Sequence, residues 1–259
     1  MWEKEEKDMI GKLEMKLESS GRLSYQMGSL FHGALMEMLP KAYADELHRS
    51  ELHPYSQYLS FKNQECYWTV CCLNEKAVKC IIGGVLQKIE KLEIKKENIE
   101  IKIVQKNYKE IRYSELLKHF YEEAGNRYLQ VHFLTPTAFK KKGNYVFYPD
   151  IRCIYQSLMN KYDAAVREES MIDEETLEQL CENSRIVRYD LKSAPFFVGK
   201  AKISGYVGKI TIKITGTQTM VNFANLLFEF GEYSGVGIKA ALGMGAFRIM
   251  KEGGDLGER

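Results

Sequence analysis

The order of strand-like and helix-like segments in the first half of the chain is the feature that most restricts its fold. Alternation of apolar and polar residues is typical of a half-buried strand, and apolar residues three or four positions apart are typical of a helix. In chain order the segments are a strand at 12–18, a helix at 27–39, strands at 55–61 and 66–73, an apolar helix at 77–89 and a strand at 99–103. This βαββαβ order is that of the ferredoxin-like unit, which RNA-recognition modules share.

The second half of the chain repeats this order with additional segments. The predicted strands are 129–134, 185–191, 207–214 and 247–250, with a short strand at 145–148, and the predicted helices are 151–166, 173–182 and 220–230. A chain of 259 residues is long enough for two such units. We therefore predict the α+β class, with two tandem ferredoxin-like (RRM-like) βαββαβ domains at residues 1–122 and 123–259.

A glycine-rich loop, SGVGIKAALGMG, occupies residues 234–245 and contains Lys239. Its start also fits the dinucleotide fingerprint, but a helical segment rather than a strand precedes it, and too little chain follows for a second strand. Glycine permits positive φ and close approach of another backbone. We expect a loop that presents main-chain N–H groups to an anion beside a lysine, although bulges in any β-rich protein also use glycine. The four glycines are Gly235, Gly237, Gly243 and Gly245.

Basic residues are concentrated between 184 and 214, although the net charge of the whole chain is only +2. The preceding stretch, 168–182, carries seven acids and no base, including Glu168 and Glu169. A basic stretch with interspersed aromatic residues is typical of a nucleic-acid-binding face, and the alternative is a solvated strand. The bases are Arg185, Arg188, Lys192, Lys200, Lys202, Lys209 and Lys213.

Three of the five histidines lie within one short segment, at His32, His48 and His53. Histidine is the side chain whose ordinary pKa suits both removal and delivery of a proton near neutrality. His48 ends a helical turn, where the negative end of the helix dipole favours a protonated imidazole. Taken singly, each is a common packed or surface histidine. Taken together, they are the candidate catalytic groups.

Composition excludes several classes of protein. No apolar run approaches the roughly 20 residues that span a bilayer, so we expect no membrane partner. The six cysteines form no C-x-x-C pair, so we expect buried free thiols in a reducing cytoplasm. No spacing of histidine, cysteine and carboxylate residues indicates a metal site, and we expect neither a metal ion nor a cofactor.

Three stretches of this chain resemble a known family. The first is FHGALMEMLP, followed by YADELH and LHPYSQYL, the second is LTPTAFKKKGNYVFYP at 134–149, and the third is the G-x-G-x5-G-x-G loop. All three are similar to segments of CRISPR-associated endoribonucleases of the RAMP superfamily. The resemblance implies two ferredoxin-like domains and processing of CRISPR repeat RNA. It further implies cleavage without metal, in which the 2′-OH attacks the adjacent phosphate and leaves 2′,3′-cyclic phosphate and 5′-OH ends.

The resemblance also implies roles for individual residues. We assign His32 and His48 as the acid/base pair, because both match positions used by family members, and His53 as a helper. Some members have a tyrosine at the position of His32 and a lysine near His53, so the division of roles stays open. We predict RNA contacts away from the cleavage chemistry for Lys239 and the four loop glycines. Further predicted RNA contacts are Lys140, Lys141, Lys142, Arg185, Arg188, Lys200 and Lys202.

Two other functions compete with the endoribonuclease. A non-catalytic CRISPR RNA-binding subunit of the same superfamily would keep the fold and the loop, but it has no need of a histidine cluster. An unrelated ferredoxin-like regulator of small molecules would show no affinity for RNA. The sequence leaves open whether an RNA hairpin or a single strand is bound, whether other effector-complex subunits are partners, and whether the protein is a monomer or a homodimer.

Overall fold

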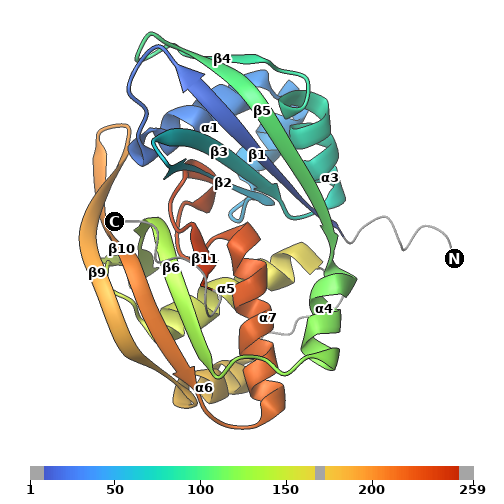
Figure 1. The fold of residues 1–259 in the computed structure, drawn as a ribbon, viewed down its shortest axis with the longest axis vertical. Helices are drawn as coiled ribbons and strands as arrows, with labels where there is room; N and C mark the ends of the chain where they lie inside the picture. Colours follow the sequence, from blue (N-terminus) through green and yellow to red (C-terminus); the bar gives the residue numbers. More distant parts are fainter. Residues whose placement is uncertain (1–8, 167–172, 251–259) are drawn as a thin grey trace, which may run out of the picture.

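The computed structural model describes residues 9–166 and 173–250, and two antiparallel sheets dominate it, one above the other in Figure 1. Glu168 and Glu169 of the acidic stretch lie outside the described residues. Each sheet is covered by helices from its own half of the chain, so each half has its own hydrophobic core. The α+β class with tandem ferredoxin-like domains is confirmed, whereas the boundary between residues 122 and 123 stays a prediction.

The N-terminal sheet has the strand order β2-β3-β1-β5-β4. Without the edge strand β4, this is the order expected for a ferredoxin-like unit. Its strands are β1 (Met9–Ser19), β2 (Tyr55–Lys62), β3 (Glu65–Cys72), β4 (Lys91–Ile94) and β5 (Ile99–Arg112). Buried and more exposed residues alternate along most of β1, which therefore contributes one face to the core, as its sequence pattern predicts.

The helices of this half follow from the expected apolar segments. They are α1 (Gly28–Met38), preceded by the 3-10 turn η1 (Tyr25–Met27), α2 (Lys41–Arg49), α3 (Glu75–Ala77) and the π-helix η2 (Val78–Leu86). Pro40 separates α1 from α2 because a proline inside a helix removes a hydrogen bond and clashes with the preceding turn. Asn74 begins α3 by accepting a hydrogen bond from the N–H of Ala77.

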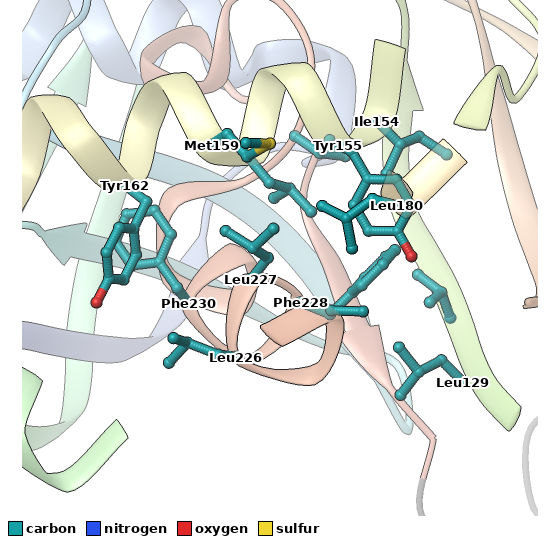
Figure 2. Packing of buried hydrophobic residues seen from close by; sticks show 14 of the residues in the cluster. Leu129, Ile154, Tyr155, Met159, Tyr162, Leu180, Leu226, Leu227, Phe228 and Phe230 are labelled. Atoms are coloured by element: carbon teal, nitrogen blue, oxygen red, sulfur yellow. The ribbon is translucent and has the colours of Figure 1, made fainter. Parts of the chain in front are cut away.

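The C-terminal sheet has the strand order β11-β6-β10-β9, again that of a ferredoxin-like unit. Its strands are β6 (Tyr128–Thr137), β9 (Ser184–Val198), β10 (Ala201–Ile214) and β11 (Phe247–Ile249), and a separate hairpin consists of β7 (Phe139–Lys141) and β8 (Asn144–Val146). The helices are α4 (Tyr113–Glu122), α5 (Ile151–Val166), α6 (Glu174–Glu182), α7 (Gln218–Ser234) and the 3-10 turn η3 (Ala240–Leu242). Figure 2 shows α5 and α7 packing through aromatic and aliphatic side chains such as Tyr155 and Phe228.

Buried hydrogen bonds join the two halves beside the glycine-rich loop. Gln57 on β2 is 1% exposed, and its Nε2 donates to the carbonyls of Gly28 at 2.8 Å and Ala241 at 3.1 Å. Trp68 Nε1 donates to Gln57 Oε1 at 2.8 Å, which fixes the orientation of the amide. One side chain therefore ties the start of α1 to the glycine-rich loop.

Candidate active site

A cleft of about 960 Å³ lies between the two halves of the molecule. One wall consists of α2, the loop 50–54 and the start of β2, and the other of α5, the β7–β8 hairpin and the glycine-rich loop. His53 and Tyr55 lie on the first wall, and Lys140, Lys161 and Lys239 lie on the second. One wall of the cleft thus carries an imidazole and a phenol, and the other carries three lysines.

The structure brings two of the three candidate histidines together. The ring of His32, on α1, lies 6.1 Å from that of His53 and 6.3 Å from that of Tyr55, centroid to centroid. The hydroxyl of Tyr55 is 2.8 Å from Nδ1 of His32. Among the described residues that line the cleft, His53 is the one histidine, and His32 lies behind it and Tyr55.

Burial keeps both histidines neutral at pH 7. The pKa of His32 is lowered to about 4, chiefly by burial and then by the nearby imidazole of His53, although a hydrogen bond to the main chain of Ala241 raises it. The pKa of His53 is lowered by burial and by the charge of His48. Burial also raises the pKa of Tyr55, which therefore stays protonated. Two neutral imidazoles and a phenol stand at one side of the cleft.

Two groups of the protein hold the ring of His32. Its Nδ1 shares a hydrogen bond with the Tyr55 hydroxyl, and the main chain of Ala241 favours the protonated ring. For His53, by contrast, Nδ1 is buried and has no hydrogen-bond partner among the described residues.

His48 lies apart from this ring cluster. Its side chain is exposed on α2, and its Nδ1 is 2.7 Å from the carbonyl of Ala44, one turn earlier in the same helix. It acts on the other two histidines through its charge rather than through ring contact. The geometry therefore pairs His32 with His53, whereas the sequence paired His32 with His48.

All four glycines of the loop have positive φ, at 64°, 77°, 108° and 73° in chain order. The prediction that the loop offers its N–H groups to an anion is wrong for most of them, because they already donate within the protein. The N–H of Gly237 donates to Ser157 Oγ, that of Ile238 to the carbonyl of Ala138, and that of Gly245 to the carbonyl of Pro136. The loop uses its glycines to pack closely against neighbouring backbone.

The loop also lies closer to the histidines than we predicted. Ala241 contacts His32, and Lys239, in the left-handed region with φ 57°, lines the same cleft as His53. The loop therefore lies beside the candidate histidines, whereas its distance from the cleavage chemistry stays a prediction. The proximity results from the buried amide of Gln57, which holds Ala241 beside the start of α1.

The remaining predicted RNA contacts fall into two places. Lys140 lines the cleft, and Lys141 and Lys142 are exposed on the same hairpin. Arg185, Arg188, Lys200 and Lys202 are all exposed on the β9–β10 hairpin, outside the cleft wall. The tip of that hairpin approaches α1, where Ser29 Oγ donates to the carbonyl of Phe197 at 3.1 Å.

Comparison with known proteins identifies the family. The model of the CRISPR-associated endoribonuclease Cas6 family matches residues 131–247. Cas6 of Streptococcus thermophilus is 35% identical over 226 residues, which cover 85% of this chain and 89% of that protein. The chain belongs to the Cas6 family. Cas6 of Mycobacterium tuberculosis (strain CDC 1551 / Oshkosh) is also 35% identical, over 86% of this chain and 71% of that protein.

Solved structures of Cas6 proteins share the fold of this chain. A Cas6 product complex aligns with a TM-score of 0.78 at 20% identity, covering 94% of this chain and 100% of that chain. Thermus thermophilus Cas6 aligns with a TM-score of 0.72 at 18% identity, covering 94% and 99%. The resemblance inferred from the sequence is confirmed, and as a Cas6 protein the chain is a CRISPR-associated endoribonuclease.

Sequence reasoning missed two residues of this candidate site. Tyr55 follows the histidine segment directly, but only the fold places its hydroxyl on His32. Lys161, on α5, donates from Nζ to the carbonyls of Ser234 at 3.2 Å and Gly235 at 3.0 Å, and burial lowers its pKa to about 7. A single lysine in an amphipathic helix carries no local signal of this contact.

The described residues of the Cas6 chain show neither a metal-ion site nor a membrane-spanning helix. Within residues 9–166 and 173–250, no group of three or more histidine, cysteine, aspartate or glutamate side chains is arranged to hold a metal ion. Over the same residues, no helix is long and apolar enough to cross a bilayer. All six cysteines are free thiols.

Proposed function

We propose that this Cas6 protein cleaves CRISPR precursor RNA within its repeats by metal-independent acid/base chemistry. The observation that carries the proposal is the ring cluster of His32, His53 and Tyr55, of which His53 and Tyr55 line the cleft together with Lys140 and Lys239. Related structures support an RNA ligand, since they include a Cas6 product complex, a Cas6 substrate mimic complex and a RAMP protein that binds different RNA substrates.

In the proposed reaction the 2′-oxygen of one nucleotide bonds to the adjacent phosphorus while the bond from phosphorus to the 5′-oxygen breaks. A neutral imidazole takes the proton of the 2′-OH, and an acid delivers a proton to the leaving 5′-oxygen. We assign one proton transfer to His53, which lines the cleft, and the other to His32, which must release its hydrogen bond with Tyr55 to reach the RNA. His48, which is exposed on α2, stays the third candidate. Tyr55 is a positioning residue, because it holds the ring of His32.

The lysines on the opposite wall supply positive charge to the scissile phosphate. Charge that develops on the phosphate oxygens needs fixed donors nearby, and such donors usually supply a large part of the rate acceleration. The phosphate in turn raises the pKa of the two histidines, because a nearby negative charge favours the protonated imidazole. Binding of RNA therefore moves His32 and His53 towards the pKa range in which proton transfer is efficient.

The β9–β10 hairpin is the proposed second contact with the RNA. The four basic residues that we predicted to contact RNA are exposed on this hairpin, and Tyr189, on β9, is 73% exposed. Basic side chains bind the phosphates and an exposed ring stacks on a base, as in other proteins that bind single strands. Its tip lies beside α1, so an RNA bound there is directed towards the helix of His32.

The proposal is tested by incubating the protein with CRISPR repeat RNAs in EDTA and analysing the product ends. We expect cleavage in EDTA, a 2′,3′-cyclic phosphate and a 5′-OH, and no cleavage when the 2′-OH at the cut is replaced by hydrogen. Cleavage that requires added Mg²⁺ contradicts the mechanism. Tight binding of repeat RNA without cleavage, in EDTA or in Mg²⁺, would support the non-catalytic subunit instead.

A further inference from the structure

The β7–β8 hairpin ends in a tight and rigid turn. Its two central residues, Lys142 and Gly143, have φ of 48° and 84°, and Lys141 pairs with Asn144 on either side of them. Two consecutive residues with positive φ are typical of the type I′ turn, whose twist matches that of a two-stranded hairpin. The turn therefore fixes the paired residues 139–146, and we call residues 139–148, which include the two residues after β8, the aromatic hairpin.

The aromatic hairpin divides its large side chains between the core and the solvent. Phe139 and Val146 are buried in the C-terminal core. Tyr145, Phe147 and Tyr148 are 45%, 48% and 59% exposed, although each carries a large ring. The core contacts of this segment are thus made by other residues, and the packing of the fold does not account for three exposed rings within four positions.

One of the exposed rings, that of Tyr145, lies beside a lysine in the cleft. Lys140 pairs directly with Tyr145 across the hairpin, and both line the cleft that contains His53. Side chains directly opposite each other in an antiparallel pair lie on the same face of the strands. Residues 139–149 include three consecutive lysines and no acidic residue, so this surface is complementary to phosphate.

We propose that the aromatic hairpin binds unpaired bases of the RNA strand that enters the cleft. Exposed rings stack on bases of any sequence, and the neighbouring lysines contact the phosphates of the same strand. Bases in a duplex are unavailable, because their faces are already stacked within the helix. This inference rests on the proposed function, and it adds that one side of the cut is held as a single strand.

The test compares single-stranded and double-stranded RNA of the same length. The probes are a fluorescein-labelled 12-nucleotide oligo(U) and a labelled 12-base-pair blunt RNA duplex. The variant Tyr145→Leu/Phe147→Leu/Tyr148→Leu keeps apolar side chains but removes all three rings, and Tyr145→Phe/Phe147→Tyr/Tyr148→Phe keeps them. Tyr121→Leu is the matched control, since Tyr121 is 78% exposed on α4, far along the chain from the aromatic hairpin.

Removal of the three rings is expected to weaken oligo(U) binding by roughly 5- to 150-fold, the range corresponding to loss of stacking on one base. Binding of the duplex should change by less than about 2-fold, and the salt dependence of oligo(U) binding should be unchanged, because the lysines remain. Both the ring-preserving variant and Tyr121→Leu should bind as the wild type does. The proposal is overturned if the affinity for both probes falls equally or if the affinity for neither falls. In the second case the exposed rings would be a contact surface for a protein partner.

The same variants separate this inference from the proposed function. If the wild type cuts no repeat RNA but the ring-free variant still loses affinity for oligo(U), the function is wrong and the single-strand site stands. If the wild type cuts repeat RNA in EDTA and the ring-free variant binds oligo(U) normally, the function stands and the single-strand site is refuted.

Discussion

Acidification from pH 7 to pH 4 is expected to destabilise this protein through His32. Its pKa is about 4 in the folded protein and 6.5 as the ordinary value, so the unfolded chain binds the proton first as the pH falls. The stabilising contribution of the neutral ring is present above pH 6.5 and is lost progressively as the pH falls towards 4. At about 1.4 kcal/mol per pKa unit, this interval corresponds to roughly 3 kcal/mol of the free energy of unfolding.

The measurement is urea unfolding of the wild type and of His32→Gln at several pH values between 7 and 4. The difference between the two free energies of unfolding isolates His32, because the carboxylates titrate in both proteins. The wild type should lose roughly 3 kcal/mol relative to the variant over this range. His119→Gln is a control of opposite sign, since the hydrogen bond with Glu229 raises the pKa of His119. The stabilising contribution of protonated His119 is present at low pH and is lost as the pH rises through its pKa in the folded protein.

Parallel curves for the wild type and His32→Gln would refute the reasoning. They would mean that His32 has a similar pKa in the folded and unfolded states, and hence that it is not held in a buried, neutral form. A loss of wild-type stability relative to His32→Gln as the pH rises, instead of as it falls, would refute the reasoning as well. In either case the assignment of His32 as a neutral proton acceptor behind the cleft would lose its physical basis.

Three further predictions concern the loop, the cleft and the basic hairpin. Gly245→Ala should lower the free energy of unfolding by more than about 2 kcal/mol in a denaturant titration, since its Cβ would lie 1.9 Å from the carbonyl oxygen of Val236 at a positive φ. Lys161→Met should flatten the rise in stability between pH 7 and pH 10, because burial lowers the pKa of this lysine to about 7 and the unfolded chain releases its proton only near 10.5. Charge reversal at Lys200 and Lys202 should reduce the slope of log affinity for single-stranded RNA against log salt by about 0.7 per lost phosphate contact, and an unchanged slope would place the RNA elsewhere.

The elements that the sequence predicted well are those with a clear local period. The alternation in β1 and the helical spacing in α1 need no information from distant residues, and both elements appear within a few residues of the predicted bounds. The edge strand β4 was missed because its four residues are too few to establish a period. The segment predicted at 77–89 is helical but mostly a π-helix, which an apolar run does not distinguish from an α-helix.

The β9–β10 hairpin is longer than predicted because its sequence contains residues that usually end strands. Pro195 lies within β9, where it is tolerated because β9 is an edge strand with β10 as its one neighbour. Gly208, with φ 120°, lies within β10 at a shift in register against β6. Such a glycine marks a bulge rather than the end of a strand. Local composition does not separate these cases.

The sequence predicts those parts of the candidate site whose residue types and spacing are typical of a function. It does not predict which of these parts lie close together. The histidine segment and the glycine-rich loop were identified by residue type and spacing. Their proximity was not, because it depends on contacts between residues far apart in the chain, such as Gln57 with Ala241. The same holds for Lys161, whose two acceptors lie in the loop after α7 and at its last residue.

The cleft requires both halves of the chain, and the buried amide of Gln57 explains how their positions are coordinated. Its Nε2 binds the carbonyl of Gly28, one turn before His32, and the carbonyl of Ala241, two residues after Lys239. The hydrogen bond from Trp68 prevents the amide from rotating, so both acceptors must stay on the Nε2 side. The imidazole wall and the lysine wall are thereby held in one arrangement before RNA arrives. Because neither half contains both walls, a ferredoxin-like unit of this chain on its own has the fold without the site.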